Sequence, residues 1–447
     1  MPRKKTTSKE VYTLYIPKGA AAIIDEIVDT DPVYKEKQVW KYKYLRALSS
    51  LVERSQERDN EFVPVSISFQ AGRLKCSNKH CLTIYRNLVN SGLVLVDKTT
   101  CRIKEHSFEY KPVYELLEAV KIQAAETDKK TREMLSEDRR LMEEQIQRDE
   151  VLKKYFEMMK KVSFCGKARF YFSNTISYSL SIPPIYPSLS SYNIPYTYLS
   201  PPLHGNFVPV SEMETFNRNL VAVDRIINGD IRVTRPDKES RIYTNITNLK
   251  RNFRKYLRLD GKPLIGLDIA NSQPLIAAVL FRRFSENKYG CIRPDVQAYQ
   301  RLCESGLFYD WFMELNGKKK EERQEFKADF FASVFFMKEY PKPGKLKRQF
   351  IEAFPTCNEA LVSFKGGYMT KKDKYSQFSI AMQKVEAALV VGVNIRLIDM
   401  GIPALNIFDS LYVTSDEHYE IAERMLKEAF KEVGLEPNVK CEDYREL

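Results

Sequence analysis

Two apolar runs that each lead to an aspartate constrain the fold of the C-terminal half most strongly. Leu264–Leu267 precedes Asp268, a pattern that predicts a buried strand presenting a carboxylate where it leaves the core. Leu405–Phe408 precedes Asp409, and another apolar run follows Ser410, which predicts a hairpin with a two-residue Asp-Ser turn. Each aspartate alone is also typical of an ordinary turn. Together they predict a divalent-metal site, because Mg2+ prefers carboxylate oxygens.

A helix over residues 322–336 is predicted between the two aspartates. Arg323, Lys327, Phe331 and Phe335 recur at steps of four, and since four residues turn an α-helix through roughly 400°, they form one slowly drifting stripe. A guanidinium and an ammonium suit a triphosphate, and two aromatic rings suit a base and sugar. Mixed faces of this kind are also common on ordinary surface helices.

In this order the segments resemble the A family of DNA polymerases, the DNA polymerase I group, and more distantly the single-subunit phage-type RNA polymerases. The resemblance covers about residues 205–447. The matching segments are Arg241–Thr244 with Thr247–Leu249 beside the duplex, Asp268 with Ser272-Gln273 as motif A, the stripe from Arg323 to Phe335 as motif B, Phe350–Pro355 after it, and Asp409-Ser410 as motif C.

The chain departs from the family pattern at several of these positions. Motif A has two extra residues between Asp268 and Ser-Gln, motif C has Phe408 for histidine, and motif B ends in Phe335 and Phe336 instead of Tyr-Gly. The glutamate that excludes a ribose hydroxyl in the DNA enzymes has no match after Gln273. The choice between dNTP and NTP therefore stays open.

The resemblance implies an α+β fold, a right-handed polymerase of palm, fingers and thumb, and template-directed nucleotidyl transfer with Mg2+, for which Mn2+ can substitute. It implies metal ligation by Asp268, the Ile269 carbonyl and Asp409, with Lys327 protonating the departing pyrophosphate. It implies nucleotide binding by Arg323, Lys327, Phe331, Phe335 and Gln273. It implies primer-template binding by Arg241, Thr244, Asn248, Arg254 and Gln383. Glu386 faces the same region by the resemblance, and ordinary helix packing is its alternative role.

The charge balance agrees with a nucleic-acid partner. Lys plus Arg (71) exceed Asp plus Glu (59), which gives a formal net charge of +12, and basic side chains replace the counterions condensed on nucleic acid. The eight cysteines are scattered, and we find no secretory leader or long apolar span. These features predict a cytoplasmic protein without a membrane partner. They leave the oligomeric state open.

Residues 1–112 are predicted to form a winged helix-turn-helix domain. A helical stretch at 33–58 precedes a helix at 78–90, followed by a β-hairpin at 93–110. The helix at 78–90 is predicted to bury Cys81, Leu82, Tyr85, Leu88 and Val89. Its candidate DNA-contacting residues are Asn78, Lys79, His80, Thr83 and Arg86. The alternative is a winged domain that only packs on the rest of the protein.

A zinc site is a further alternative within this domain. Cys76, Cys81, Cys101 and His106 offer four nitrogen or sulfur ligands, but both pair spacings lie at the edge of the usual range. Cys81 also fits the buried helix face, so we assign no metal there.

The remaining segments complete a three-part organisation. Residues 113–204 are predicted to form a charged, solvated helical arm or a thumb-like arm, followed by a linker rich in Pro, Ser and Tyr, and 205–447 the polymerase-like core. We expect a DNA polymerase without a proofreading exonuclease that replicates a plasmid, phage or other mobile element. Three alternatives remain: a single-subunit RNA polymerase or primase-like enzyme, a DNA-binding initiator or regulator with an inactive polymerase fold, and untemplated terminal transfer.

Overall fold

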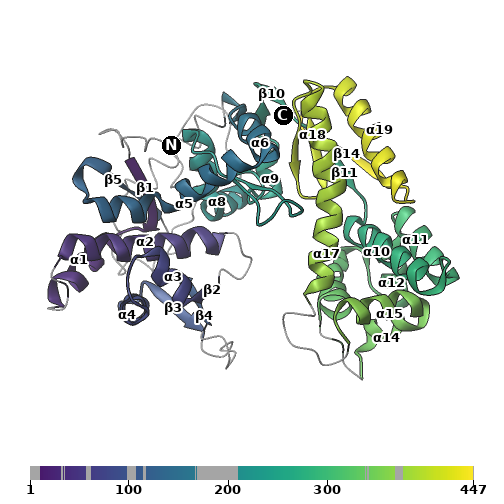
Figure 1. Cartoon of the computed structure of the whole chain (residues 1–447), viewed down its shortest axis with the longest axis horizontal. Helices are drawn as coiled ribbons and strands as arrows, with labels where there is room; N and C mark the ends of the chain where they lie inside the picture. The colour runs from purple at the N-terminus through teal and green to yellow at the C-terminus, as the bar shows by residue number, and fades with distance from the viewer. Residues whose placement is uncertain are drawn as a thin grey trace. The chain divides into compact units, whose positions relative to one another are not determined.

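The chain is an α+β protein that divides into two compact, interleaved units (Figure 1). The computed structural model describes residues 11–31, 34, 36–56, 62–97, 107–113, 117–166, 168, 210–337, 339, 342–367 and 376–445. Unit 1 comprises Met1–Arg148, Phe164–Ile231 and Asn248–Asn252, and unit 2 comprises Asp149–Ser163, Arg232–Thr247 and Phe253–Leu447. The boundaries expected after residues 112 and 204 both fall inside unit 1.

Unit 1 is built around strands and helices of the first 148 residues. Its helices and strands are β1 (Val11–Pro17), α1 (Ala20–Thr30), α2 (Lys37–Gln56), β2 (Val63–Ser66), α3 (Ile67–Arg73), α4 (Asn78–Asn90), β3 (Val94–Asp97), β4 (Ser107–Pro112), β5 (Leu117–Gln123), α5 (Lys129–Arg148) and α8 (Val210–Asn228). β5 pairs antiparallel with β1, so residues beyond 112 belong to the N-terminal fold.

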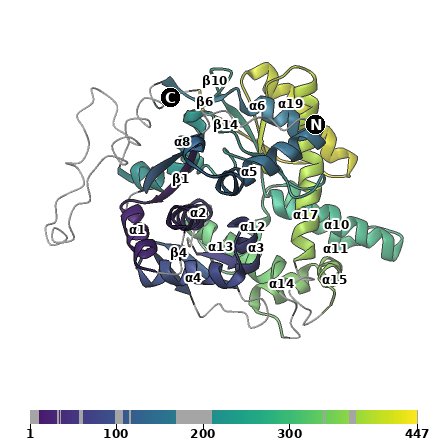
Figure 2. The same ribbon diagram turned by 60° about the vertical axis from the view of Figure 1, so that its left-hand side comes forward.

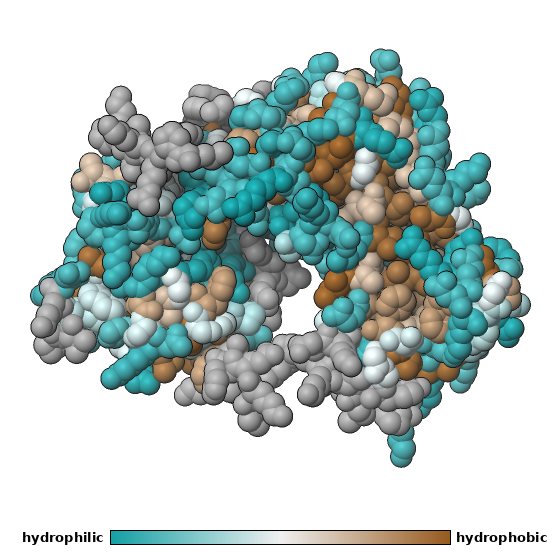
Figure 3. All heavy atoms as spheres, viewed as in Figure 1, coloured by the Kyte–Doolittle hydropathy of each residue, from teal (hydrophilic) through white to brown (hydrophobic). Residues whose placement is uncertain are grey.

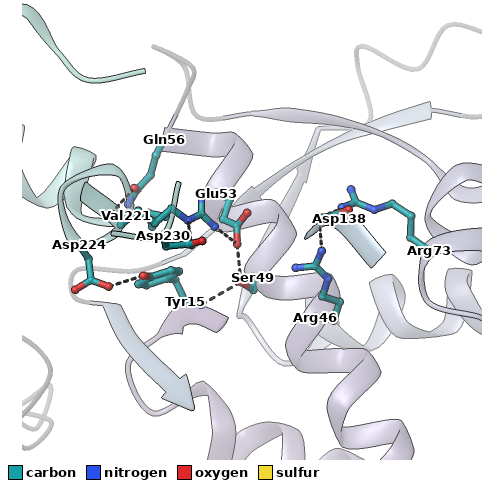
Figure 4. Close-up of polar contacts among 11 residues, drawn as sticks. Tyr15, Arg46, Ser49, Glu53, Gln56, Arg73, Asp138, Val221, Asp224 and Asp230 are labelled. Carbon is teal, nitrogen blue, oxygen red and sulfur yellow. Dashed lines mark hydrogen bonds and ion pairs between the residues drawn. The ribbon is translucent and has the colours of Figure 1, made fainter. Parts of the chain in front are cut away.

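Helix α2 is the centre of unit 1, seen nearly end-on in Figure 2. It buries polar as well as apolar residues, and its Ser49 hydroxyl accepts the Tyr15 backbone N–H at 3.0 Å. Figure 4 shows polar contacts around it, among them the hydrogen bond that Tyr15 donates to Asp224. Arg225 pairs with Glu53 at 3.0 Å. These contacts attach α8 to β1 and α2.

Helix α5 is not a solvated arm as expected, but part of unit 1. Asp138 on α5 accepts hydrogen bonds from Arg46 on α2 and Arg73 at the end of α3 (Figure 4). The helix also buries four apolar side chains, Met134, Leu135, Met142 and Ile146. The spacing of apolar residues and the many charges predict an amphipathic helix. They do not show which part of the protein covers its apolar face.

The predicted long helix breaks where the chain enters unit 2. Asp149 is extended, and its carboxylate accepts the backbone N–H groups of Val151 and Leu152 as the N-cap of α6 (Glu150–Met159). The same carboxylate pairs with Arg235 at 2.6 Å. Capping side chains end one helix and begin the next because they satisfy N–H groups that lack helical partners.

Helices α3 and α4 lie in the sequence between β2 and β3, and β2, β3 and β4 form an antiparallel sheet of order β2-β4-β3. Ser77 caps α4, and Cys81, Ile84, Tyr85 and Leu88 form its buried face. Leu82, which the sequence analysis expects inside, is 38% exposed. Cys101 and His106 of the zinc alternative lie outside the described residues, as does much of the expected hairpin.

Unit 2 contains a small sheet surrounded by helices. The elements wholly or partly in it are α6, β6 (Val162–Phe164), β7 (Val233–Thr234), β8 (Tyr243–Thr244), α9 (Arg251–Arg254), β9 (Leu257–Leu259), β10 (Lys262–Pro263), β11 (Ile265–Ile269), α10 (Ser272–Tyr289), α11 (Pro294–Glu304), α12 (Phe308–Leu315), α13 (Arg323–Phe330), π-helical Phe331–Phe335, α14 (Lys345–Ala353), α15 (Pro355–Phe364), α17 (Gln377–Glu386), π-helical Ala387–Val391, α18 (Gly392–Asp399), β12 (Leu405–Ile407), β13 (Ser410–Val413), α19 (Asp416–Glu432) and β14 (Val439–Asp443).

The principal sheet of unit 2 has the strand order β12-β13-β11-β14, with every pairing antiparallel. Leu267 lies opposite Leu411, and both are buried in the apolar core. Their face packs against α19, which begins at the Ser415 cap and ends before Gly434. Because side chains alternate along a strand, the neighbouring position Asp268 lies on the other face.

Aromatic side chains fill the core under the helices of unit 2. Phe308, Phe312 and Phe330 contact one another edge-on or tilted, and Phe350 contacts Phe330 edge-on and stacks on Phe312, with ring centroids 4.9–6.4 Å apart. Such contacts add to the free energy that apolar burial supplies. The core therefore fixes α12, α13 and α14 relative to one another.

One helical stretch of unit 2, Gln377–Asp399, is long and apolar enough to cross a membrane, so the expected absence of such a span does not hold. Half of its most apolar window is buried inside the protein, as in a core helix. Phe378, Met382 and Leu397 are fully buried. Figure 3 shows apolar residues gathered where α17 and α18 run.

Gly266 on β11 allows the Tyr412 ring to lie across the polar face of the sheet. A Cβ at this position would lie 2.8 Å from Tyr412 Cε1 and 3.2 Å from Glu442 Cβ. We expect Gly266→Ala to lower the free energy of unfolding by about 1–3 kcal/mol, the usual cost of overpacking. Urea unfolding measures the change.

Gly392 in α18 provides the matched control. Nothing lies within 4 Å of a Cβ built there, and its φ of −59° is helical. Gly392→Ala should stabilise the protein by roughly 0.5–1 kcal/mol through helix propensity. Equal effects of the two substitutions would contradict the close approach at Gly266.

Candidate active site

The sheet of unit 2 brings Asp268 next to the hairpin that carries Asp409. Asp268 on β11 lies directly opposite Ser410 on β13. The Ser410 hydroxyl donates to Asp268 Oδ1 at 2.8 Å. The two distant sequence segments therefore meet on one face of the sheet.

The hairpin turn consists of Phe408 and Asp409, one residue earlier than predicted, because Ser410 already pairs with Ile407. Phe408 has a φ of 54°, which is uncommon for a residue with a side chain. Its ring contacts Tyr243 at a centroid distance of 6.0 Å and lies 5.0 Å from the Arg241 guanidinium. These contacts hold Phe408 in its strained backbone conformation. Strained residues of this kind are common at functional sites.

The Asp409 carboxylate lies in an unfavourable environment for a negative charge. Burial raises its pKa, a hydrogen bond from the Ser272 hydroxyl lowers it, and the charge of Asp268 raises it again. Two carboxylates that repel each other in a partly buried site favour a bound cation.

The donor set fits a hard divalent cation. In the part of the chain that the structure describes, no group of three or more His, Cys, Asp or Glu side chains forms a metal cluster. Two carboxylates would leave the remaining positions to water, substrate phosphate or a backbone carbonyl, as Mg2+ requires. Ile269 follows Asp268 on β11, at the strand end where a carbonyl ligand was predicted.

Lys327 lies within electrostatic range of both aspartates. Burial and the charge of Arg323 lower its pKa, and Asp268 and Asp409 oppose this. Its Nζ lies 5.1 Å from the centre of the Tyr309 ring, and the Arg323 guanidinium lies 5.7 Å from the same ring. Lys327 of the predicted stripe thus lies near the two acids, whereas the Arg323 guanidinium pairs with Asp310 at 3.5 Å.

Tyr309 is a site residue that sequence reasoning missed. It is 2% exposed, and burial raises the pKa of its hydroxyl well above the ordinary value, with Arg323 lowering and Asp409 raising it. Helix α12 has only the pattern of an apolar helix, so no local signal distinguishes this residue. Its ring supports two cations through cation–π contacts.

The second half of the predicted stripe is interrupted. Helix α13 ends at Phe330, and Phe331–Phe335 is π-helical. Phe331 is partly buried near Tyr309, whereas Phe335 is 0% exposed among core rings. The prediction that Phe335 presents a ring to a nucleotide is therefore wrong for this structure, because a π-helix turns less per residue than the assumed α-helix.

Glu386 at the end of α17 joins two predicted site residues. The Arg241 guanidinium pairs with its carboxylate, and Gln273 Nε2 donates to its Oε2 at 2.6 Å. The Glu386 side chain is 1% exposed. Burial raises its pKa to about 7, Arg241 lowers it, and Asp409 raises it. Arg241 and Gln273 are thus committed to an internal network beside Asp409.

The other predicted primer-template residues have different surroundings. Arg254 Nη1 donates to the Tyr412 hydroxyl at 2.7 Å, on the polar face of the sheet. Thr244 pairs with Val233 between β8 and β7, and its hydroxyl is buried. Gln383 precedes Glu386 by one helical turn and is partly exposed. Asn248 belongs to unit 1.

Three of the candidate DNA-contacting residues of unit 1, Lys79, Thr83 and Arg86, lie on one side of α4. Asn78, Lys79 and Arg86 are exposed, and Thr83 is partly exposed with its hydroxyl donating to the Lys79 carbonyl at 3.1 Å. Positions 79, 83 and 86 are spaced by four and three residues, so they share a side of the helix. His80, partly exposed, packs edge-on against Trp40 at 5.1 Å.

Comparison with known proteins gives limited similarity. No protein-family model matches the chain, and no curated protein matches it. Among solved structures, the POL domain of Pol1 from M. smegmatis, in complex with DNA primer-template and dNTP, matches with a TM-score of 0.34 and 14% sequence identity. The match covers 50% of each chain. The assignment of function therefore rests on the residues of the site itself.

The raised pKa of Glu386 predicts a pH-dependent contribution to stability. Between pH 4.5, the ordinary pKa of a glutamate, and about pH 7, the folded state holds a proton that the unfolded state releases. Stability therefore falls as pH rises through this window and is level above it. Glu386→Gln lacks the titrating carboxyl and therefore lacks this pH dependence. As pH rises from 4.5 to 8, the free energy of unfolding of the variant should increase by about 3 kcal/mol relative to that of wild type.

Urea unfolding of both proteins at pH 5, 6, 7 and 8 measures this difference. Glutamine keeps a carbonyl acceptor for Arg241, which limits other changes. Glu428→Gln in α19 is the control, because this side chain is exposed. A constant stability difference between Glu386→Gln and wild type across this range would contradict the assignment.

Proposed function

We propose that unit 2 is a template-directed nucleotidyltransferase that synthesises DNA. One observation carries the proposal: Asp268 on β11 and Asp409 in the adjoining β12–β13 turn, 141 positions apart in the sequence, lie close together with Lys327 in electrostatic range of both. A pair of acids with a lysine nearby suits phosphoryl transfer, in which negative charge on the reacting oxygens must be neutralised.

Each residue of the site has a proposed role. Asp268 and Asp409 would hold divalent metal, which supplies charge neutralisation and lowers the pKa of a bound hydroxyl. Ser410 and Ser272 orient these two carboxylates through hydrogen bonds. Arg323 and Lys327 bind the triphosphate. Burial lowers the pKa of Lys327 and so favours proton transfer to the departing pyrophosphate.

Unit 1 is proposed to bind DNA as a winged helix-turn-helix. The proposal is supported by the order α2, β2, α3, α4 and the β3–β4 pair, and by the exposed Lys79 and Arg86 on α4. A DNA-binding unit joined to a polymerase core suits the replication of a plasmid, phage or other mobile element.

Primer extension tests the catalytic proposal. A labelled primer is offered with and without template, with dNTP or NTP, in Mg2+ or Mn2+, to wild type, Asp268→Asn and Asp409→Asn. We expect templated extension with dNTP by wild type only. Loss in each variant should exceed the roughly 10–100-fold that removing an outer partner of a metal site costs.

Each other outcome identifies a different enzyme class. Extension with NTP indicates an RNA polymerase or primase-like activity, and extension of a single strand without template indicates terminal transfer. Retained DNA binding without extension in either metal indicates an initiator or regulator with an inactive polymerase fold.

The metal prediction has a readout besides activity. Removing one of two repelling carboxylates should leave stability unchanged or raise it in the absence of divalent cations. Adding Mg2+ should raise the melting temperature of wild type, since a ligand that binds only the folded state stabilises it. Asp268→Asn and Asp409→Asn should lose this shift. An equal shift in all three proteins would contradict a metal site at these residues.

Gel-shift titration at several salt concentrations tests unit 1. Lys79→Ala and Arg86→Ala should each weaken DNA binding and reduce the logarithmic salt slope by about 1 if each removes one phosphate contact. Lys121→Ala, an exposed lysine on β5, is the matched control. Binding that is unchanged in the α4 variants would contradict the assigned face.

A further inference from the structure

The turn between α3 and α4 holds Cys76 at the junction of two helix caps. The Lys75 N–H donates to the Gly72 carbonyl at 3.3 Å. The Cys76 N–H donates to the Ala71 carbonyl at 3.0 Å. With the left-handed φ of 48° at Lys75, these two bonds form a Schellman motif that ends α3. Ser77 is then the N-cap of α4, so Cys76 completes one helix end and directly precedes the next helix.

Cys76 and Cys81 occupy two positions whose side chains meet at the start of a helix. Cys76 immediately precedes the N-cap, and Cys81 follows the N-cap by four residues. This spacing usually brings two apolar side chains into contact. Here the two thiols hydrogen-bond to each other. Cys81 is 0% exposed in the core of unit 1, whereas Cys76 packs against that core and stays partly exposed.

A buried lysine places positive charge beside this thiol pair. Lys43 on α2 is 6% exposed, and its Nζ donates at 3.2 Å to the carbonyl of Lys75, the residue before Cys76. The hydrogen bond from Cys81 lowers the pKa of the Cys76 thiol to about 7; burial opposes this shift, and the charge of Lys43 adds to it. The same hydrogen bond, together with burial, raises the pKa of Cys81. Cys76 therefore carries the thiolate, which is the nucleophilic form of cysteine.

We propose that Cys76 and Cys81 form a modification site that a hydroperoxide oxidises to a disulfide, with Cys76 as the reacting thiol. The inference is independent of the proposed function. A thiolate beside a cation, partly exposed and in contact with a second thiol, has the features of a peroxide-reactive cysteine with a resolving partner.

The reaction has two steps. The Cys76 thiolate attacks the O–O bond of the peroxide, which forms a sulfenic acid on Cys76 and releases an alkoxide or hydroxide that takes a proton from water. The Cys81 sulfur then attacks the Cys76 sulfur, the S–O bond breaks, and the departing hydroxide takes the Cys81 proton and leaves as water. Two thiols are thus oxidised to one disulfide, and the peroxide is reduced to an alcohol, or to water if it is hydrogen peroxide, together with one further water.

Peptide mass spectrometry of the whole chain, after treatment with hydrogen peroxide and alkylation of the remaining thiols, tests the site. Trypsin cleaves after Lys79, so Cys76 and Cys81 fall on separate peptides that a disulfide joins. Cys441 on β14 is the internal control: it is exposed, its thiol hydrogen-bonds to Tyr419, and burial raises its pKa.

We expect the two peptides to be recovered as one linked species, which dithiothreitol separates, at peroxide concentrations that leave Cys441 free. Free thiols at positions 76 and 81 after Cys441 has been oxidised would overturn the proposal. Sulfinic acid on Cys76 without any disulfide would also overturn it, because Cys81 would then not act as the resolving thiol. This measurement uses wild type alone and does not depend on the folding of any variant.

Variants separate the resolving thiol from the groups that activate Cys76. Cys81→Ser keeps a hydrogen-bond donor but removes the second sulfur, so a sulfenic acid should accumulate on Cys76 and be trapped by dimedone. Cys81→Ala removes the donor as well, and Lys43→Met removes the charge at nearly constant length. The pH midpoint of Cys76 alkylation by iodoacetamide should lie near 7 in wild type.

This midpoint should stay near the wild-type value in Cys81→Ser. It should rise toward the ordinary thiol value of about 8.5 in Lys43→Met and further in Cys81→Ala, which lacks the stronger of the two effects. A role of the two cysteines in packing alone would leave no such order among the variants. A wild-type midpoint at the ordinary value would overturn the assignment of Cys76 as the reacting thiol.

Discussion

The repulsion between two carboxylates at one edge of a small sheet is the constraint on which the site of unit 2 depends. Asp268 and Asp409 are brought together by backbone pairing of β11 with β13, and each accepts a serine hydroxyl. Burial and mutual repulsion make the ionised pair unfavourable without nearby positive charge. Lys327 on α13 supplies part of that charge, and a divalent cation would supply more.

A second buried acid shows how the surroundings limit this positive charge. The Arg241 guanidinium lies over the ring of Phe408, the residue before Asp409. Its ion pair, however, is with Glu386 and not with Asp409. Breaking a buried ion pair by removing one partner is usually costly. Arg241 therefore acts in this structure as a positioning residue that holds the end of α17 and the Phe408–Asp409 turn, and Gln273 completes the same network.

Local patterns in the sequence predict the strand ends and the capped helices but not the packing between distant segments. Asp268 and Asp409 each follow a run of adjacent apolar residues, which is a local signal for a strand. The positions of both aspartates at strand ends could therefore be predicted from the sequence. Tyr309 and Glu386 reach the site only through tertiary packing and carry no local signal. The spacing of four that defines the Arg323–Phe335 stripe assumes a regular α-helix, and the π-helical turn invalidates it after Phe331. The charge of residues 129–148 likewise predicts a helix but not that Arg46 and Arg73 bind its Asp138.

The interleaving of the two units has a consequence for synthesis on the ribosome. The chain changes unit after residues 148, 163, 231, 247 and 252. Unit 1 therefore lacks part of its chain until residue 252 has left the exit tunnel, by which point two segments of unit 2 have already emerged without their partners. Vectorial folding, in which an N-terminal unit is finished before the next begins, is not available to this topology. The segments Asp149–Ser163 and Arg232–Thr247 therefore leave the ribosome before the residues of unit 2 against which they pack, Phe253–Leu447, have been synthesised.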